Sequence, residues 1–279
     1  MRVIQSEAIT DAVRRLYIES NYVLPDDVRR AIASCKACED WAPAVETLDR
    51  IIENYEIAEN ENVPICQDTG VACVFIEIGQ NVHVQGNMED AINEGVRQGY
   101  REGYLRASVV SDPLQRSNTK DNTPAMIYYD IVQGDGLKLT VAPKGFGSEN
   151  MSKITMLPPT EGVEGVKEFI LKCVTEAGSN PCPPIIVGVG IGGTFDKAAL
   201  LAKKSLLRPT DDTHSDPFYA SLEDELLKAV NATGIGPQGF GGRTTALAVK
   251  IEVMPTHIAG LPVAVNLNCH AARHISVEL

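Results

Sequence analysis

Apolar residues recur at helical spacing through the first 60 residues. One stretch has the 3.6-residue period of an amphipathic helix, and it contains Ala8, Ala12, Val13, Leu16 and Tyr17. A second helix is predicted to begin at Pro25, because Asp26 and Asp27 then place acids in its first turn. A third is predicted over residues 42–55, with Val45, Leu48, Ile51 and Ile52 on one face. We therefore expect a helical N-terminal subregion over residues 1–60.

The pattern changes at Pro64, beyond which strands alternate with helices. Residues 71–78 are β-rich and apolar and predict a buried strand, and residues 87–106 predict a helix. Two strands flank Gly134-Asp135-Gly136, which predicts a hairpin turn. Further helices are predicted over 164–176, 194–207 and 218–230, and further strands over 185–189, 245–253 and 263–265. The fold class is therefore mixed α/β (α+β): a helical N-terminal segment followed by mixed β-sheets covered by helices. No linker is evident, so a single domain over residues 1–279 is expected.

Composition excludes several classes of protein. Hydrophobic residues make up 44% of the chain, which favours a packed core over disorder. The net charge of -12 argues against nucleic acid, because phosphates need a basic surface. A few local arginines can still reverse the field in a pocket, so an anionic small substrate remains compatible. No apolar run is long enough to span a membrane, and the N-terminus lacks the apolar region of a secretory signal. We therefore expect a cytoplasmic protein.

Four of the seven cysteines have ordinary structural explanations. In a reducing compartment, seven cysteines do not predict a disulfide framework. Cys73 and Cys173 have apolar neighbours and are expected to be buried thiols. Cys35 and Cys38 form a C-x-x-C that could bind zinc or be redox-active, but no second pair accompanies it. We interpret that segment as the end of a surface helix.

Cys66, Cys182 and Cys269 differ, because each lies in a predicted loop among turn-forming or polar residues. Three thiolates in similar settings suggest one shared metal site, either an iron–sulfur cluster or zinc. With three ligands instead of four, one iron of a cluster would stay open to bind substrate as a Lewis acid.

Cys66 is followed directly by Gln67 and Asp68, in a turn between Pro64 and Gly70. A loop of this kind can point a soft metal ligand and a proton-transfer group into one cleft. The alternative for Asp68 is turn capping, which is common for aspartate in loops. Arg106 could bind a carboxylate through two parallel hydrogen bonds, and its alternative is a surface residue at a helix end.

Residues 188–193 fit the G-x-G-x-x-G pattern of dinucleotide-binding proteins. The acid expected about 20 residues on would be Asp211 or Asp212, but both are predicted in a loop and not at the end of a second strand. Tight packing of a strand against the following helix explains these glycines better.

Taken together, several motifs resemble the α-subunit, or N-terminal half, of the iron–sulfur hydro-lyases that include class I fumarase and L-tartrate dehydratase. The matching segments run in order along most of the chain: 66–70, 105–109, 118–125, 144–150, 190–196 and 257–274.

The resemblance implies a [4Fe–4S] cluster held by Cys66, Cys182 and Cys269. It also implies reversible dehydration of a 2-hydroxy dicarboxylate, malate to fumarate first and L-tartrate to oxaloacetate second. Gln67 and Asp68 would lie beside the substrate, Arg106 would bind a substrate carboxylate, and the backbone of Gly145 would face the substrate. His257 would be catalytic, near the active-site entrance.

Further catalytic residues would come from a β-subunit, in an α2β2 heterotetramer. Two rival functions remain open: a non-catalytic iron–sulfur sensor and a nucleotide-binding scaffold.

Overall fold

The computed structural model describes residues 1–279, and the contacts of the chain divide it into two compact units. The first unit consists of Met1–Pro25, Asn54–Phe146 and Arg273–Leu279, and the second of Asp26–Glu53 and Gly147–Ala272. The helices of the first 60 residues are therefore divided between the units. Because the chain passes repeatedly from one unit to the other, neither is a continuous segment. The single domain over 1–279 stays a prediction.

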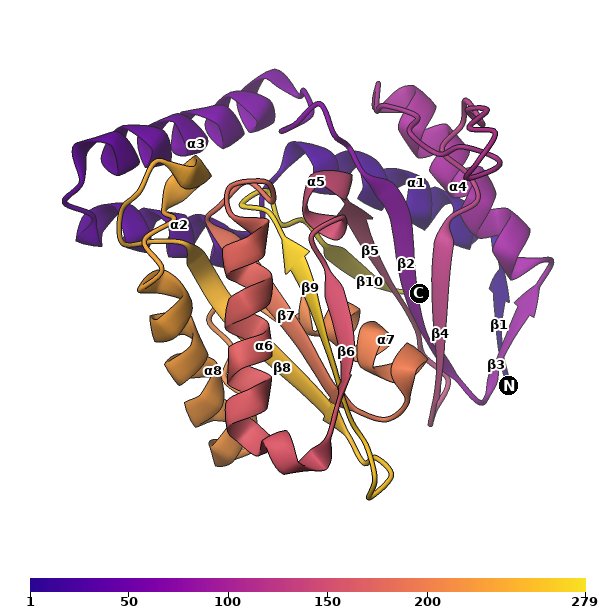
Figure 1. The fold of residues 1–279 in the computed structure, drawn as a ribbon. Coiled ribbons are helices and arrows are strands. Elements are labelled where there is room, and N and C mark those ends of the chain that lie inside the picture. Colours follow the sequence, from indigo (N-terminus) through magenta and orange to yellow (C-terminus); the bar gives the residue numbers. More distant parts are fainter. The chain divides into compact units, whose positions relative to one another are not determined.

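The first unit is built on a four-stranded sheet in the order β10-β5-β2-β4, and its strands are labelled in Figure 1. A two-stranded parallel ribbon, β1-β3, accompanies it. The bounds of its strands are β1 Arg2–Gln5, β2 Val71–Gly79, β3 Val82–Gln85, β4 Met126–Val132, β5 Leu137–Lys144 and β10 Ile275–Glu278. Its helices are α1 Ser6–Tyr22 and α4 Met88–Glu102, and α3 Ala42–Glu61 passes into it at Asn54.

Helices α1 and α4 pack tightly against each other because glycines of α4 face α1. A side chain at Gly95 would begin 2.7 Å from the carbonyl oxygen of Thr10. The buried side chains of α1 and α4 join those of β2 and β5 in one core, as the apolar periodicity of these segments predicts. The Tyr17 hydroxyl also donates to the carbonyl oxygen of Cys73, at 2.7 Å, which fixes α1 to the middle of β2.

The predicted hairpin at Gly134-Asp135-Gly136 is wrong, although both strands exist. β4 pairs in parallel with β2, and β5 pairs antiparallel with β2, so β2 lies between them. The glycine-containing turn passes over the end of β2, where the Gly79 amide donates to the carbonyl oxygen of Gly136 at 2.9 Å. Gly79 permits this approach, since a side chain there would begin 2.5 Å from the Gly134 carbonyl oxygen.

The second unit contains the other four-stranded sheet, in the order β6-β9-β7-β8. Its strands are β6 Lys153–Leu157, β7 Ile185–Gly192, β8 Ala246–Met254 and β9 Leu261–Asn268. Its helical elements are α2 Asp26–Cys38, most of α3, α5 Phe146–Glu149, η1 Pro159–Glu161, α6 Gly162–Ala177, α7 Phe195–Ser205, α8 Pro217–Asn231 and η2 Pro237–Gly239, with α5 starting at the boundary between the units. The two sheets with their covering helices confirm the mixed α/β class. None of these helices has both the length and the apolar character needed to cross a membrane.

The glycine pattern of residues 188–193 serves strand-to-helix packing, as predicted. Val187 and Val189 of β7 join the core formed with α6 and α8. Successive side chains of a strand point to opposite faces, so Gly188 and Gly190 face the other way. There they meet α7: a side chain at Gly188 would begin 2.4 Å from the Ala202 carbonyl oxygen, and one at Gly190 2.1 Å from that of Ala198.

Replacing Gly190 with alanine is therefore expected to lower the free energy of unfolding by about 3 kcal/mol, because the new methyl group overlaps the backbone of α7. Gly136→Ala is the matched control: nothing lies within 4 Å of its would-be side chain. It should change stability by less than about 0.5 kcal/mol. Denaturant unfolding of the two variants checks this, and equal midpoints would contradict the packing role.

Candidate functional site

The Cys66 loop of the first unit connects α3 to β2 and is held by hydrogen bonds on both sides of the cysteine. The Ile65 amide donates to the carbonyl oxygen of Asn21 at 2.9 Å, and the Ile65 carbonyl oxygen accepts from the Asn54 side chain at 2.9 Å. After the cysteine, the Asp68 carbonyl oxygen accepts from Nη2 of Arg273 at 3.0 Å. The loop is thus fixed by its surroundings even though it contains no regular structure.

The Cys66 thiol is half-buried and is not part of a disulfide. Its Sγ accepts from the Asp68 amide at 3.4 Å and lies 3.4 Å from Oε1 of Gln67. The thiolate is the form of cysteine that binds metals. Cys66 and its two neighbours therefore form a compact group of a sulfur, an amide and a carboxylate.

The Asp68 carboxylate joins this loop to the end of β5. Oδ1 accepts from the Gly70 amide at 3.0 Å, and Oδ2 accepts from the Phe146 amide at 2.8 Å. A side chain at Gly145 would begin 3.2 Å from Oδ2. The structure thus brings together Asp68 and Gly145, two of the residues that the sequence singled out.

The backbone of Arg106 is hydrogen-bonded to the same loop. Its amide donates to Oγ1 of Thr69 at 2.9 Å, and its carbonyl oxygen accepts from that hydroxyl at 3.2 Å. The side chain is exposed and makes no ion pair with a protein carboxylate. A guanidinium left free in this way can bind an incoming carboxylate through two hydrogen bonds.

Two buried side chains that the sequence analysis did not single out hold the carbonyl groups behind the loop. The Tyr100 hydroxyl lies 3.1 Å from the Thr69 carbonyl oxygen and 2.9 Å from that of Gly70. Asn122 donates to the Gly70 carbonyl oxygen at 3.2 Å and accepts from the Ser108 amide at 2.7 Å. Burial raises the pKa of Tyr100, so the hydroxyl stays protonated and able to donate.

In the second unit, Cys182 and Cys269 lie at the same end of the sheet. Cys182 precedes β7 and Cys269 follows β9, and the antiparallel register places Ile186 opposite Asn268. The His270 amide donates to the Cys182 carbonyl oxygen at 3.3 Å, which ties the two loops together. The register of β7 and β9 therefore brings two of the three predicted metal ligands to one place.

His257 is not brought to these cysteines. It lies in the exposed loop between β8 and β9, where β9 begins, whereas Cys269 follows the end of β9. Eight strand residues separate the two ends, a length of about 25 Å. His257 of this chain therefore lies far from its own Cys182 and Cys269.

The predicted ligand set is divided between the units, with Cys66 in the first and Cys182 and Cys269 in the second. In neither unit do three histidine, cysteine, aspartate or glutamate side chains form a metal site. The donor chemistry fits an iron–sulfur cluster, because all three thiols are outside disulfides and sulfur is the ligand that such clusters use. A further feature fits an anionic group near the Cys66 loop: Nε of Arg273 is buried and has no partner.

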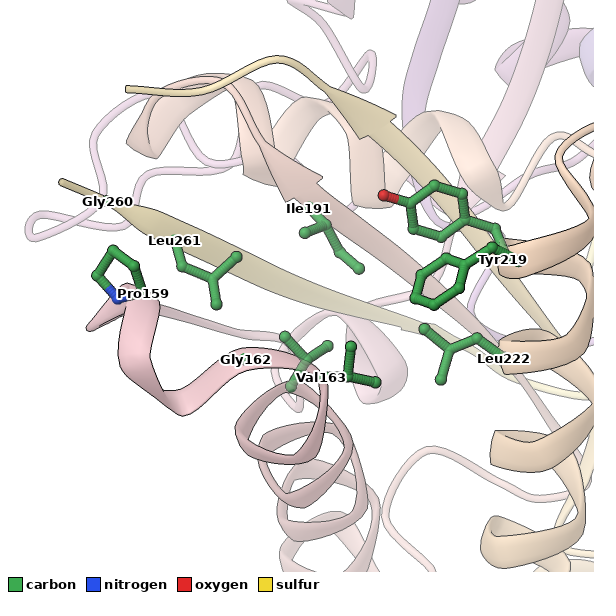
Figure 2. A pocket seen from close by; sticks show the side chains of 10 residues that line it. Pro159, Gly162, Val163, Ile191, Tyr219, Leu222, Gly260 and Leu261 are labelled. Atoms are coloured by element: carbon green, nitrogen blue, oxygen red, sulfur yellow. The ribbon is translucent and has the colours of Figure 1, made fainter. Parts of the chain in front are cut away.

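A pocket in the second unit is unsuited to a charged substrate. It has a volume of about 260 Å³ and lies between α6, α8 and the sheet. Figure 2 shows the apolar side chains of Val163, Ile191, Leu222 and Leu261 around it. Its lining contains no lysine, arginine or cysteine. Moving two carboxylates into such a site without cations would cost far more than the cavity returns.

Comparison with known proteins identifies the family. A family model described as fumarate hydratase (Fumerase) matches residues 10–278. The chain is 45% identical over 272 residues to a Methanocaldococcus jannaschii protein named as a candidate L(+)-tartrate dehydratase subunit alpha, and the match covers 95% of each chain. It is 32% identical over 254 residues to the L(+)-tartrate dehydratase subunit alpha of Escherichia coli and to that of Shigella sonnei, which covers 90% of this chain and 84% of each relative.

The chain therefore belongs to the fumarate hydratase family, which confirms the family resemblance inferred from the motifs.

Proposed function

We propose that this chain is the α-subunit of a [4Fe–4S]-dependent hydro-lyase that dehydrates a 2-hydroxy dicarboxylate. The observation that carries the proposal is the loop in which Cys66, Gln67 and Asp68 lie beside Gly145 and beside the backbone of Arg106. The relatives' names favour L(+)-tartrate as the first substrate to test, and malate and fumarate come second. This order reverses the one that the sequence motifs suggested.

We propose Cys66, Cys182 and Cys269 as the cluster ligands. All three lie outside disulfides, and the His270 amide that donates to the Cys182 carbonyl oxygen keeps the loops of Cys182 and Cys269 together.

When bound, the cluster supplies one iron without a cysteine ligand, a Lewis acid that weakens the C–O bond of the leaving hydroxyl. The residues of this chain orient the substrate and move a proton. Arg106 binds one substrate carboxylate, and its positive charge stabilises the negative charge that grows there when the neighbouring C–H proton is lost. The Gln67 side chain, exposed beside the thiol, donates a hydrogen bond to the substrate.

Asp68 in its protonated form gives its proton to the departing oxygen, which leaves as water, and the carboxylate that remains takes a proton from solvent before the next turnover. Each of its carboxylate oxygens already accepts one backbone amide, and an ionised carboxylate has about four acceptor positions. It therefore keeps its orientation while retaining room for a proton or for the substrate hydroxyl.

The remaining catalytic groups come from a β-subunit, in an α2β2 assembly. His257 lies about 25 Å along the sheet from its own Cys182 and Cys269. If His257 acts on substrate, it does so at the site of another copy of the chain, and two α-subunits in one assembly supply such a copy.

The test is anaerobic reconstitution of the chain with iron, sulfide and the β-subunit of the same organism, followed by assays of oxaloacetate from L(+)-tartrate and of fumarate from malate. We expect turnover of L(+)-tartrate by the mixture and none by the chain alone. A cluster that forms without turnover of any hydroxy diacid would favour the sensor function instead. Tight binding of NAD by the isolated chain would favour the nucleotide scaffold.

A further inference from the structure

Arg273 is a buried cation without an acidic partner. The residue is 2% exposed, and its guanidinium makes no ion pair with a protein carboxylate. Nη1 donates to Oδ1 of Asn21 at 2.9 Å, Nη2 donates to the Asp68 carbonyl oxygen at 3.0 Å, and Nε has no partner. Arginine is almost never buried unless it is paired, so this arrangement calls for a reason.

Stability does not supply that reason. A buried charge carries a desolvation penalty that only close, well-paired opposite charges offset. Two neutral oxygens compensate for it poorly, and the N–H group at Nε has no partner. A hydrophobic residue of similar size would avoid this penalty. The guanidinium is therefore better explained by what it does for its neighbours.

Those neighbours are the two sides of Cys66. Arg273 binds the Asp68 carbonyl oxygen directly. It also binds the side chain of Asn21, whose own carbonyl oxygen accepts from the Ile65 amide at 2.9 Å. The residues before and after the cysteine are thus both connected to one guanidinium.

The connection is anchored in the core of the first unit. Asn21 is fully buried, and its Nδ2 donates to the Tyr17 carbonyl oxygen at 2.9 Å. Tyr17 is in turn bonded to β2. Displacement of Arg273 would therefore release the loop from a rigid support.

We propose that Arg273 is a positioning residue that holds the Cys66 loop in its ligand-ready conformation and places an uncompensated positive charge beside it. The second part rests on the proposed function, because a cluster held by three thiolates is an anion. In a low-dielectric site, such a charge stabilises an anion far more than it would in water.

The test uses two variants of the full chain without metal, each checked for folding by its thermal midpoint. Arg273→Met removes the charge and both hydrogen bonds. Arg273→Lys keeps the charge but cannot make both bonds in the same geometry. Arg97→Met, which removes an arginine of the same unit paired with Asp121, is the control.

The readout is the rate of amide hydrogen exchange in residues 65–70, followed by mass spectrometry, because this rate does not depend on whether the Cys66 thiol is ionised. We expect Arg273→Met to raise that rate about 10-fold, the factor that matches the loss of about one hydrogen bond to a charged group. Arg273→Lys should fall between it and the wild type, and Arg97→Met should change nothing. An unchanged rate in a folded Arg273→Met chain would overturn the positioning role, and if that variant does not fold, Arg273→Lys decides.

Comparison of Arg273→Met with Arg273→Lys separates charge from position, because only the first loses the positive charge. After anaerobic reconstitution, we expect the midpoint reduction potential of the cluster to be lower in Arg273→Met than in Arg273→Lys. Equal potentials would overturn the role of the charge. If the wild type takes up no cluster while Arg273→Met still loosens residues 65–70, the proposed function fails and the positioning role stands.

Discussion

Replacement of Cys66 with serine is expected to abolish cluster assembly and to reduce lyase turnover to below about one-hundredth of wild type. Changes to residues that only support metal ligands cost about 10–100-fold in affinity or activity, so loss of a ligand should cost more. Serine is nearly isosteric with cysteine but lacks the soft thiolate that iron–sulfur clusters require. The measurements are iron and sulfide content, the visible absorbance of the cluster, and turnover after anaerobic reconstitution with the β-subunit.

Cys38→Ser is the matched control. Cys38 is an exposed cysteine at the end of α2 and is outside any disulfide. The Cys38→Ser variant should assemble the cluster and turn over substrate like the wild type. If Cys66→Ser gives the same cluster absorbance as Cys38→Ser, then Cys66 is not a ligand and the proposed site is wrong.

Local periodicity was enough to place the long elements. The apolar run at residues 71–78 became β2 with one residue added, and the predicted helix over 87–106 became α4 within a few residues. These elements are set by burial of one face or of a whole strand, which leaves a clear pattern in the sequence. The same is true of Cys73 and Cys173, which are buried as their apolar neighbours predicted.

The order of the strands in the sheet could not be predicted from local periodicity. Strands β4 and β5 have the sequence of a hairpin, yet β2 lies between them. The choice depends on contacts between distant segments: the parallel pairing of β2 with β4 and the antiparallel pairing of β2 with β5. The short strands β1, β3, β6 and β10 were also missed, because four or five residues carry too weak a period.

The candidate site could be predicted only in part from the sequence, because it also depends on contacts between distant segments. Motifs indicated Cys66 and Asp68, but the pairing of Cys182 with Cys269 at one end of the sheet follows from the register of β7 and β9. The sequence analysis did not single out Arg273, because no local pattern around it predicts a buried arginine. Only the fold of β10 back onto β5 shows why it is buried.

Replacement of Asp68 with asparagine is expected to lower kcat by about 10²- to 10⁴-fold, the usual contribution of a general acid or base, with a much smaller change in KM. The amide is close in size to the carboxylate and still offers one oxygen to accept from the Gly70 amide. It cannot exchange a proton near neutral pH. Its NH2 group would face the Phe146 amide, so the hydrogen bond to Oδ2 would also be lost.

Asp112→Asn tests the competing explanation that Asp68 only caps a turn. Oδ1 of Asp112 accepts from the amides of Leu114 at 2.9 Å and Gln115 at 2.6 Å, and these bonds hold its pKa below the ordinary value. Asp112 therefore accepts two backbone amides, as Asp68 does, although both of its bonds lie within one turn and the loop contains no predicted ligand. If capping were the whole function of Asp68, the two variants would lose similar activity. A kcat for Asp68→Asn within about threefold of that for Asp112→Asn would exclude proton transfer by Asp68, because the chemical step would then have lost less than about 1 kcal/mol.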